Sequence, residues 1–274
     1  MKHKKRWIFL AAACAAAAVT AAGLDQELVT RTYTLSTEKL SRPVRLALLT
    51  DLHACTYGPG QRELLDAVEA AHPDLVLLGG DILDDDPALD PENAWAVLRA
   101  LGTAYPTFYV TGNHEFWSGR AEVWKGRIAA LGVTVLAGDC ATVVFQGQPL
   151  NLCGVDDPAV GEEAWQAQLL RAAEAADPAY FTLLLSHRPE RAEDYRGFDL
   201  VLAGHAHGGQ WRLPGLLNGL FAPDQGPLPA FAGGLYQMGE TTLAVSRGLA
   251  RESTRVPRLF NPPELVVLDV VPAR

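Results

Sequence analysis

Four short polar motifs contain five of the chain's seven histidines, and each motif follows an apolar run that resembles a buried strand. They are Asp51-Leu52-His53, Gly112-Asn113-His114-Glu115, Ser186-His187 and Gly204-His205-Ala206-His207. Gly80-Asp81 ends a fifth apolar run and adds a carboxylate. Layered α/β proteins build their sites at the carboxyl ends of strands. We therefore expect these side chains to gather at one edge of a sheet.

Aspartate, histidine and asparagine are ligands that suit a pair of divalent cations. Imidazole favours zinc, iron or manganese, and carboxylate favours the harder ions. Asp51 and His53 are two residues apart, so on an extended strand end both point to one face, and the spacing of His205 and His207 is the same. Two cations about 3.5–4 Å apart clamp both oxygens of a phosphoryl displacement and lower the pKa of the water between them. This residue set predicts a two-metal hydrolase.

The motif around His114 adds a residue for proton transfer. Gly112 permits a tight turn, Asn113 offers a neutral carbonyl ligand, and His114 is left free to handle protons. Any one motif is also compatible with a capped turn whose polar groups are satisfied. Capping does not explain the whole set.

The elements that position these motifs alternate between strand and helix. Buried strands are predicted at 44–50, 74–79, 107–111, 181–186 and 200–203, and helices at 61–71, 91–101, 119–131 and 162–176. This alternation predicts a layered α/β domain. Short strands at 133–136, 142–145 and 150–155 leave no room for helices between them, so the sheets are expected to be mixed. Strands at 241–246 and 265–271 close the chain.

Residues 208–239 are rich in glycine and proline, which predicts an absence of regular structure. The six large apolar residues in its first half are compatible with core packing, with an apolar wall for an acyl chain and with a face on a membrane. They are Trp211, Leu213, Leu216, Leu217, Leu220 and Phe221. The three acids at 84–86 are interpreted as a solvated turn.

The N-terminus indicates export. A basic start precedes an uncharged apolar run from Trp7 to Leu24, so residues 1–24 are predicted to be a signal peptide or membrane anchor, and 25–43 a stalk or edge segment. The domain is then anchored or exported, outside the cytoplasm; a buried N-terminal helix of an intracellular protein is the alternative. The net charge of -9 argues against nucleic acid as a partner. Besides Cys14, the odd number and wide spacing of Cys55, Cys140 and Cys153 predict no disulfide framework.

The ordered motif series resembles the calcineurin-like metallophosphoesterase superfamily. All five blocks occur in order between residues 44 and 207. The resemblance implies a metallophosphoesterase domain over 44–274, built as a four-layer α/β/β/α sandwich with mixed sheets. It also implies two divalent metal ions (Mn, Zn or Fe) that activate a hydroxide at the strand ends.

The resemblance implies a role for each motif residue. Asp81 bridges the two ions, and His114 donates a proton to the leaving oxygen, with Glu115 beside it as an orienting partner. The remaining ligands are Asp51, His53 and His207 for the first ion, and Asn113, His187 and His205 for the second. From their residue type, Arg247 and Arg251 are predicted either to bind non-bridging phosphate oxygens or to pair with surface acids.

Residues 202–210 and the N-terminal run resemble bacterial membrane-associated or exported phosphodiesterases, some of them similar to UDP-2,3-diacylglucosamine pyrophosphatases of lipid A synthesis. The predicted function is therefore hydrolysis of phosphodiester or pyrophosphate bonds in lipid-linked or cell-wall-derived substrates. One alternative is that pyrophosphatase itself, although it works at the cytoplasmic face and the basic N-terminus favours export. The other is a metal-stabilised surface-binding module without turnover.

Overall fold

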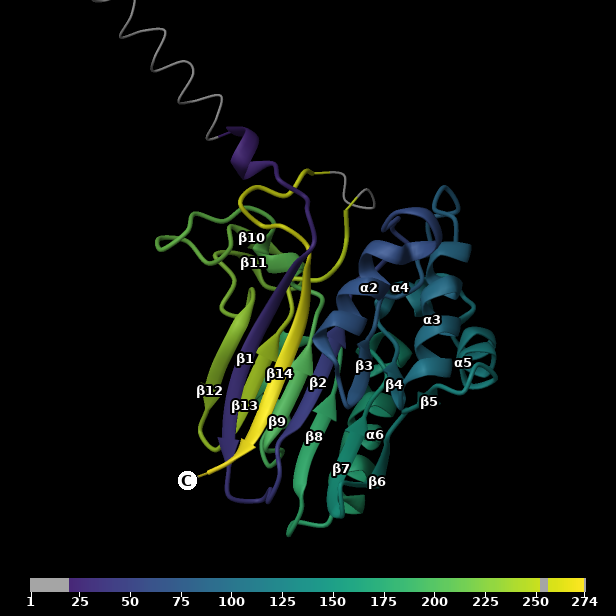
Figure 1. Ribbon diagram of the computed structural model, residues 1–274, viewed down its shortest axis with the longest axis vertical. Coiled ribbons are helices and arrows are strands. Elements are labelled where there is room, and N and C mark those ends of the chain that lie inside the picture. The colour runs from purple at the N-terminus through teal and green to yellow at the C-terminus, as the bar shows by residue number, and fades with distance from the viewer. Residues whose placement is uncertain (1–19, 252–255, 274) are drawn as a thin grey trace, which may run out of the picture.

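Two six-stranded mixed sheets pack face to face, and helices cover their outer faces (Figure 1). The computed structural model describes residues 20–251 and 256–273. The arrangement is the four-layer α/β/β/α sandwich that the motif resemblance implies. Residues 1–19, which hold most of the predicted signal peptide or anchor, lie outside the described residues. Within the described part of the chain, no helix is long and apolar enough to cross a bilayer.

The first sheet carries the motifs of the N-terminal half. Its strands, in spatial order, are β1 (Val29–Thr37), β14 (Glu264–Pro272), β2 (Val44–Leu49), β3 (Leu75–Gly79), β4 (Thr107–Val110) and β5 (Thr134–Val135). Strands β2 to β5 run parallel to one another, and β14 runs antiparallel to β2. Strand β1 pairs in parallel with β14, so the 25–43 segment contributes the edge strand of this sheet.

The second sheet carries the motifs of the C-terminal half. Its strands, in order, are β12 (Gly234–Met238), β13 (Thr241–Val245), β9 (Leu200–Ala203), β8 (Phe181–Leu185), β7 (Gln148–Gly154) and β6 (Asp139–Phe145). The four central strands are parallel, and the two edge strands are antiparallel to their neighbours. Strand β12 and the small hairpin of β10 (Phe221–Ala222) and β11 (Gly226–Pro227) lie in the 208–239 segment. The expectation of no regular structure there was wrong, because an edge strand needs only one partner and tolerates a glycine-rich flank.

Helices occupy the connections between parallel strands. The α-helices are α2 (Arg62–Ala71), α3 (Glu92–Ala104), α4 (Asn113–Trp117), α5 (Ala121–Ala129) and α6 (Glu162–Ala175). Short 3-10 segments are η1 (Pro59–Gln61), η2 (Pro158–Val160) and η4 (His207–Gly209), and η3 (Pro189–Tyr195) is a longer one with a kink at Arg191. Right-handed crossovers place such helices on the outer face of a parallel sheet, which keeps the strand ends free for the site.

Three apolar layers hold the sandwich together. Leu46 and Leu48 of β2 face the second sheet, whereas Ala47 and Leu49 pack under α2 and α3. Side chains alternate between the two faces of a strand, so a strand that is buried on both faces must be apolar throughout. Strand β2 is accordingly apolar at every position except Arg45, whose partly exposed side chain pairs with Asp269. Trp165 of α6 packs in the third layer, against the outer face of the second sheet.

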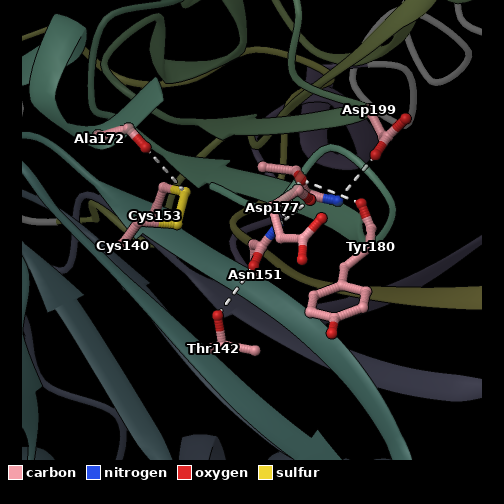
Figure 2. The surroundings of a disulfide bond; sticks show 9 residues. Cys140, Thr142, Asn151, Cys153, Ala172, Asp177, Tyr180 and Asp199 are labelled. Carbon is pink, nitrogen blue, oxygen red and sulfur yellow. Dashed lines mark hydrogen bonds between the residues drawn. A yellow bond between two sulfur atoms is a disulfide. The ribbon is translucent and has the colours of Figure 1, made fainter. Parts of the chain in front are cut away.

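A disulfide joins Cys140 of β6 to Cys153 of β7, which corrects the expectation of no disulfide (Figure 2). The two cysteines are directly opposite one another in the antiparallel pair. Cross-strand neighbours of this kind are brought together by register, which cysteine spacing does not reveal. Cys55 is buried outside any disulfide, and its Sγ accepts a hydrogen bond from the backbone N–H of Arg251.

Candidate metal centre

The predicted metal ligands converge at the carboxyl ends of five parallel strands. Strands β2, β3 and β4 of the first sheet and β8 and β9 of the second deliver them, each at the loop that follows its strand. Five of the ligands adopt left-handed backbone conformations, with φ between 46° and 63°: Asp51, His53, Asp81, His205 and His207. Such strained conformations in residues other than glycine concentrate at functional sites, where the surrounding structure enforces them.

Asp81 lies at the middle of the cluster. Its Oδ2 is 3.0 Å from Nε2 of His187 and 3.7 Å from Nε2 of His53, which belong to different sheets. Its Oδ1 accepts a hydrogen bond of 2.9 Å from the backbone N–H of His114. Gly112 is required beside it, since a Cβ at that position would come within 2.2 Å of Oδ1 of Asp81. One carboxylate therefore faces both halves of the site.

The unpartnered atoms of the cluster fit a pair of cations. Buried polar side-chain atoms nearly always have hydrogen-bond partners. Five atoms of the predicted ligands are buried without one: Asp51 Oδ2, His53 Nε2, Asn113 Oδ1, His205 Nδ1 and His207 Nδ1. Ligand atoms of Asp51, His53 and His207 lie within 4.8 Å of one another, as do those of Asp81, His187 and His205. Two groups of nitrogen and oxygen donors around a shared carboxylate suit two divalent metal ions.

Three of the histidines are oriented by a partner on their other ring nitrogen. Nδ1 of His187 lies 2.8 Å from the carbonyl oxygen of Gly79, and Nδ1 of His53 lies 2.6 Å from Oδ2 of Asp84. Such contacts fix the tautomer and ring angle of a metal-binding histidine. The interpretation of 84–86 as a solvated turn was therefore wrong for Asp84. The position of Asp84, three residues after Asp81, was the sequence signal that could have indicated its role.

Asp224 orients His205 from the 208–239 segment, and sequence reasoning missed it. Its Oδ2 is 2.8 Å from Nε2 of His205. Asp224 also pairs with Arg188, whose guanidinium is held by Asp157 through two hydrogen bonds of 2.5 and 3.1 Å. No sequence pattern links Asp224 to the motifs, because it lies in an irregular segment.

His114 faces solvent beside two carboxylates. Its Nδ1 is 2.6 Å from Oδ1 of Asp85 and 3.6 Å from Oδ2 of Asp84, and a quarter of its side chain is exposed. Burial opposes its protonation, but Asp84, Asp81 and Asp85 outweigh burial and raise the pKa of His114 to about 9. The arrangement presents a protonated imidazole at the mouth of the site.

Glu115 does not orient His114, which corrects the expectation for this residue. Its fully buried carboxylate accepts hydrogen bonds from four backbone N–H groups, those of Asp81, Ile82, Leu83 and Gly112. Burial and the charge of Asp81 raise the pKa of Glu115 to about 7 against these hydrogen bonds. Glu115 therefore ties the loop after β3 to the loop after β4.

The concentration of negative charge perturbs the ligands themselves. Asp81 and Asp51 outweigh the burial of His187 and raise its pKa to about 10. Burial dominates at His207, where the pKa falls to about 3 although Asp51 opposes the shift. The nearby histidines hold the pKa of Asp81 well below its usual range in spite of burial. A site of this kind attracts cations.

Neither predicted phosphate-binding arginine is left without an acidic partner. Arg251 pairs with Glu63 at 2.6 Å and lies over the ring of Tyr57, and Arg247 pairs with Glu264 at 3.3 Å. Phosphate binding by Arg247 or Arg251 stays a prediction.

Comparison with known proteins agrees with this geometry. The family model for calcineurin-like phosphoesterases matches residues 44–209. A metallophosphoesterase of Campylobacter jejuni, Cj0846, is 32% identical over 84% of this chain and 60% of its own length. The phosphodiesterase YaeI of Escherichia coli is 32% identical over 84% of this chain and 83% of its own, and the metallophosphoesterase YkuE of Bacillus subtilis 28% over 82% and 78%. The chain thus spans less than two thirds of the Campylobacter protein.

Proposed function

Because the chain belongs to the calcineurin-like phosphoesterase family, we propose that it is a metal-dependent hydrolase of phosphodiester or pyrophosphate bonds. The observation that carries the proposal is the set of five buried, unpartnered donor atoms around Asp81. Their side chains come from both sheets, so residues with strained backbone conformations and buried polar atoms gather at one site. The Escherichia coli relative YaeI is named a phosphodiesterase, which supports the preference for diesters.

The proposed ligand sets are those of the motif series, with Asp81 shared between them. Two divalent ions, when bound there, would neutralise charge on the phosphate and activate a water for attack. Zinc, manganese and iron all suit imidazole, carboxylate and amide donors, and the native pair depends on supply. Asp84, Asp224 and the carbonyl of Gly79 keep three imidazoles in the ligand orientation.

His114 supplies the proton for the leaving oxygen. Asp85 holds its Nδ1–H, so the Nε2–H is free to donate to a departing alkoxide. The histidine recovers its proton from solvent, to which it is partly exposed. This division leaves the buried histidines for binding and reserves the exposed one for proton transfer.

A cavity of about 380 Å³ lies next to the carboxylates that hold His114, and it is the proposed place for the leaving group. Its lining includes Asp84 and Asp85 as well as Trp95, Trp124 and Arg120. Indole rings and a guanidinium group suit a flat leaving group better than a bare alkyl chain. Substrates with such a group are the ones to test first.

The test is hydrolysis of bis-p-nitrophenyl phosphate by the purified full chain loaded with manganese, zinc or iron. Bound metal is counted by elemental analysis in the same samples. Asp81→Asn is expected to lose both ions and all turnover, whereas Asp194→Asn, which removes an exposed carboxylate paired with Arg191, keeps both. Two bound ions without hydrolysis of any diester or pyrophosphate would reject the enzyme and favour the surface-binding module. The substrate panel includes UDP-2,3-diacylglucosamine and cell-wall phosphodiesters.

We also infer that the catalytic domain works outside the cytoplasm. Disulfides persist in oxidising compartments, and the bond between Cys140 and Cys153 supports the export indicated by the basic N-terminus. Added protease should digest the domain on intact spheroplasts. Digestion only after lysis would contradict this location.

A further inference from the structure

Three arginines converge on a second cavity, of about 420 Å³, whose lining includes none of the metal-site side chains. Arg31 comes from β1, Arg212 from the segment after η4, and Arg247 from the loop after β13. Leu213 and Leu216 are among the other lining residues. We call this cavity the arginine pocket.

The arginine pocket carries excess positive charge. Among the described residues, Glu264 is the one acid that pairs with any of the three arginines, and its Oε2 lies 3.1 Å from Nε of Arg31 and 3.3 Å from Nε of Arg247. Arg212 instead donates to the carbonyl oxygen of Gly208 and to Asn218. Three guanidinium groups against one carboxylate leave a net charge of +2. Burial, together with the charge of Arg247, lowers the pKa of Arg212 to about 10.

The rim of the arginine pocket is apolar and exposed. Leu216 is 88% exposed and Leu213 is 47% exposed, and Leu220 and Phe221 follow them at 41% and 55%. Core packing was one interpretation of these residues, and it was wrong for these four. A run of large apolar side chains in water next to a cationic hollow indicates a surface that is covered in use.

The apolar N-terminal run ends beside the arginine pocket. The carbonyl oxygen of Gly23 accepts a hydrogen bond from the backbone N–H of Phe260, which lines the pocket. A Cβ at Gly23 would come within 2.7 Å of the Leu259 side chain, so the chain passes tightly over this face. In sequence, the uncharged run from Trp7 ends at Leu24. A membrane that holds this run would therefore meet the protein at the arginine pocket.

We propose that the arginine pocket binds the headgroup phosphate of an anionic phospholipid, while Leu213 and Leu216 enter the acyl layer. Guanidinium groups match phosphate oxygens through paired N–H donors, and membranes with anionic lipids attract cationic surfaces. Cationic groups next to exposed apolar side chains are typical of a membrane-facing surface. The proposal rests on the prediction that residues 1–24 are retained as a membrane anchor, and not on the proposed hydrolysis.

Docking at the arginine pocket also fixes how the metal centre faces the bilayer. Arg212 holds the carbonyl oxygen of Gly208, the residue after the metal ligand His207. The loop of Arg247 continues into Gly248, where a Cβ would lie within 2.6 Å of Oδ2 of Asp51. The pocket and the metal centre therefore share two loops, the one after β9 and the one after β13. A bound lipid would hold both loops.

The test measures lipid binding by the full chain in dodecyl maltoside micelles, with native mass spectrometry as the readout. Dioctanoyl phosphatidylglycerol is expected to bind in one copy, and dioctanoyl phosphatidylcholine at least about tenfold more weakly. The variant Arg31→Gln/Arg212→Gln should weaken phosphatidylglycerol binding about 25-fold, from about fivefold for each cationic residue at an anionic surface. The matched control, Arg42→Gln/Arg196→Gln, removes the same charge from exposed positions and should leave binding unchanged.

Equal retention of phosphatidylcholine would overturn the proposal, and so would equal losses in the variant and its control. Displacement of the lipid by millimolar inorganic phosphate would also overturn it, by indicating a site for free phosphate. A thermal unfolding midpoint equal to that of wild type shows that the variant folds; if it misfolds, Arg31→Gln alone, at a 43% exposed side chain, should weaken binding about fivefold. Hydrolysis and lipid binding are measured in separate experiments, so the failure of one proposal can be distinguished from the failure of the other.

Discussion

Replacement of Glu115 tests whether this buried carboxylate, which is not one of the predicted metal ligands, holds the site together. In Glu115→Ala, four backbone N–H groups lose their acceptor, including those of Asp81 and Gly112. The backbone of Asp81 is then free to shift within a cluster whose donor atoms must stay within a few ångströms of each other. We expect a less stable protein that also binds its metals more weakly.

The structure sets the size of the effect. Each buried, unsatisfied N–H costs about 2 kcal/mol, so four cost about 8 kcal/mol. Removing the carboxylate returns part of this, because its pKa is raised from 4.5 to about 7, which corresponds to about 3 kcal/mol at neutral pH or above. The net loss is about 5 kcal/mol. In Glu115→Gln, one acceptor oxygen and the relief of charge remain, so the loss is about 1 kcal/mol.

Thermal unfolding at pH 8 with excess chelator separates folding from metal binding. A loss of about 5 kcal/mol lowers Tm by roughly 10–20 °C in a domain of this size, and the Gln variant falls by only a few degrees. The control is Glu69→Gln, an exposed glutamate on α2. A Tm for Glu115→Ala within 2 °C of wild type, with full metal content after reloading, would refute the reasoning about these four hydrogen bonds.

Three further predictions concern the proton donor, a ligand partner and the disulfide. His114→Gln should slow hydrolysis of an alkyl phosphodiester about 10²–10³-fold and that of a nitrophenyl ester far less, because nitrophenolate departs without a proton. Asp224→Asn should weaken binding of one ion about tenfold in chelator competition, because Nε2 of His205 loses a charged partner. Replacement of Cys140 and Cys153 by serine should lower the free energy of unfolding in urea by about 2–4 kcal/mol.

Each of these has an outcome that contradicts it. Equal slowing of both esters by His114→Gln, with metal content intact, would assign the histidine to phosphate binding. Unchanged affinity for both ions in Asp224→Asn would make its contact with His205 incidental. The disulfide adds nothing to stability if the double serine variant is as stable as wild-type protein in which the disulfide has been verified.

Local patterns were enough to place the central strands of both sheets and the motifs, although they missed β10, β11 and β12. Strand β2 was predicted because five of its six residues are apolar, which is typical of a strand that is buried on both faces. Asp51 and Asp81 were identified because a polar residue directly after such a run lies at the edge of a sheet. The four-layer arrangement came from the motif resemblance, and the three apolar layers agree with it.

Contacts between distant segments were decided by the tertiary structure alone. Asp224 meets His205 from an irregular loop, and Glu264 meets Arg31 across the pairing of β14 with β1. Cys140 meets Cys153 because the register of one hairpin places them opposite each other. Hydrophobic periodicity and turn chemistry act over a few residues, so the sequence by itself determined the elements and the residues at their ends. The partners of those residues depend on how two sheets pack and on which loops then come into contact, and only the assembled fold decides that.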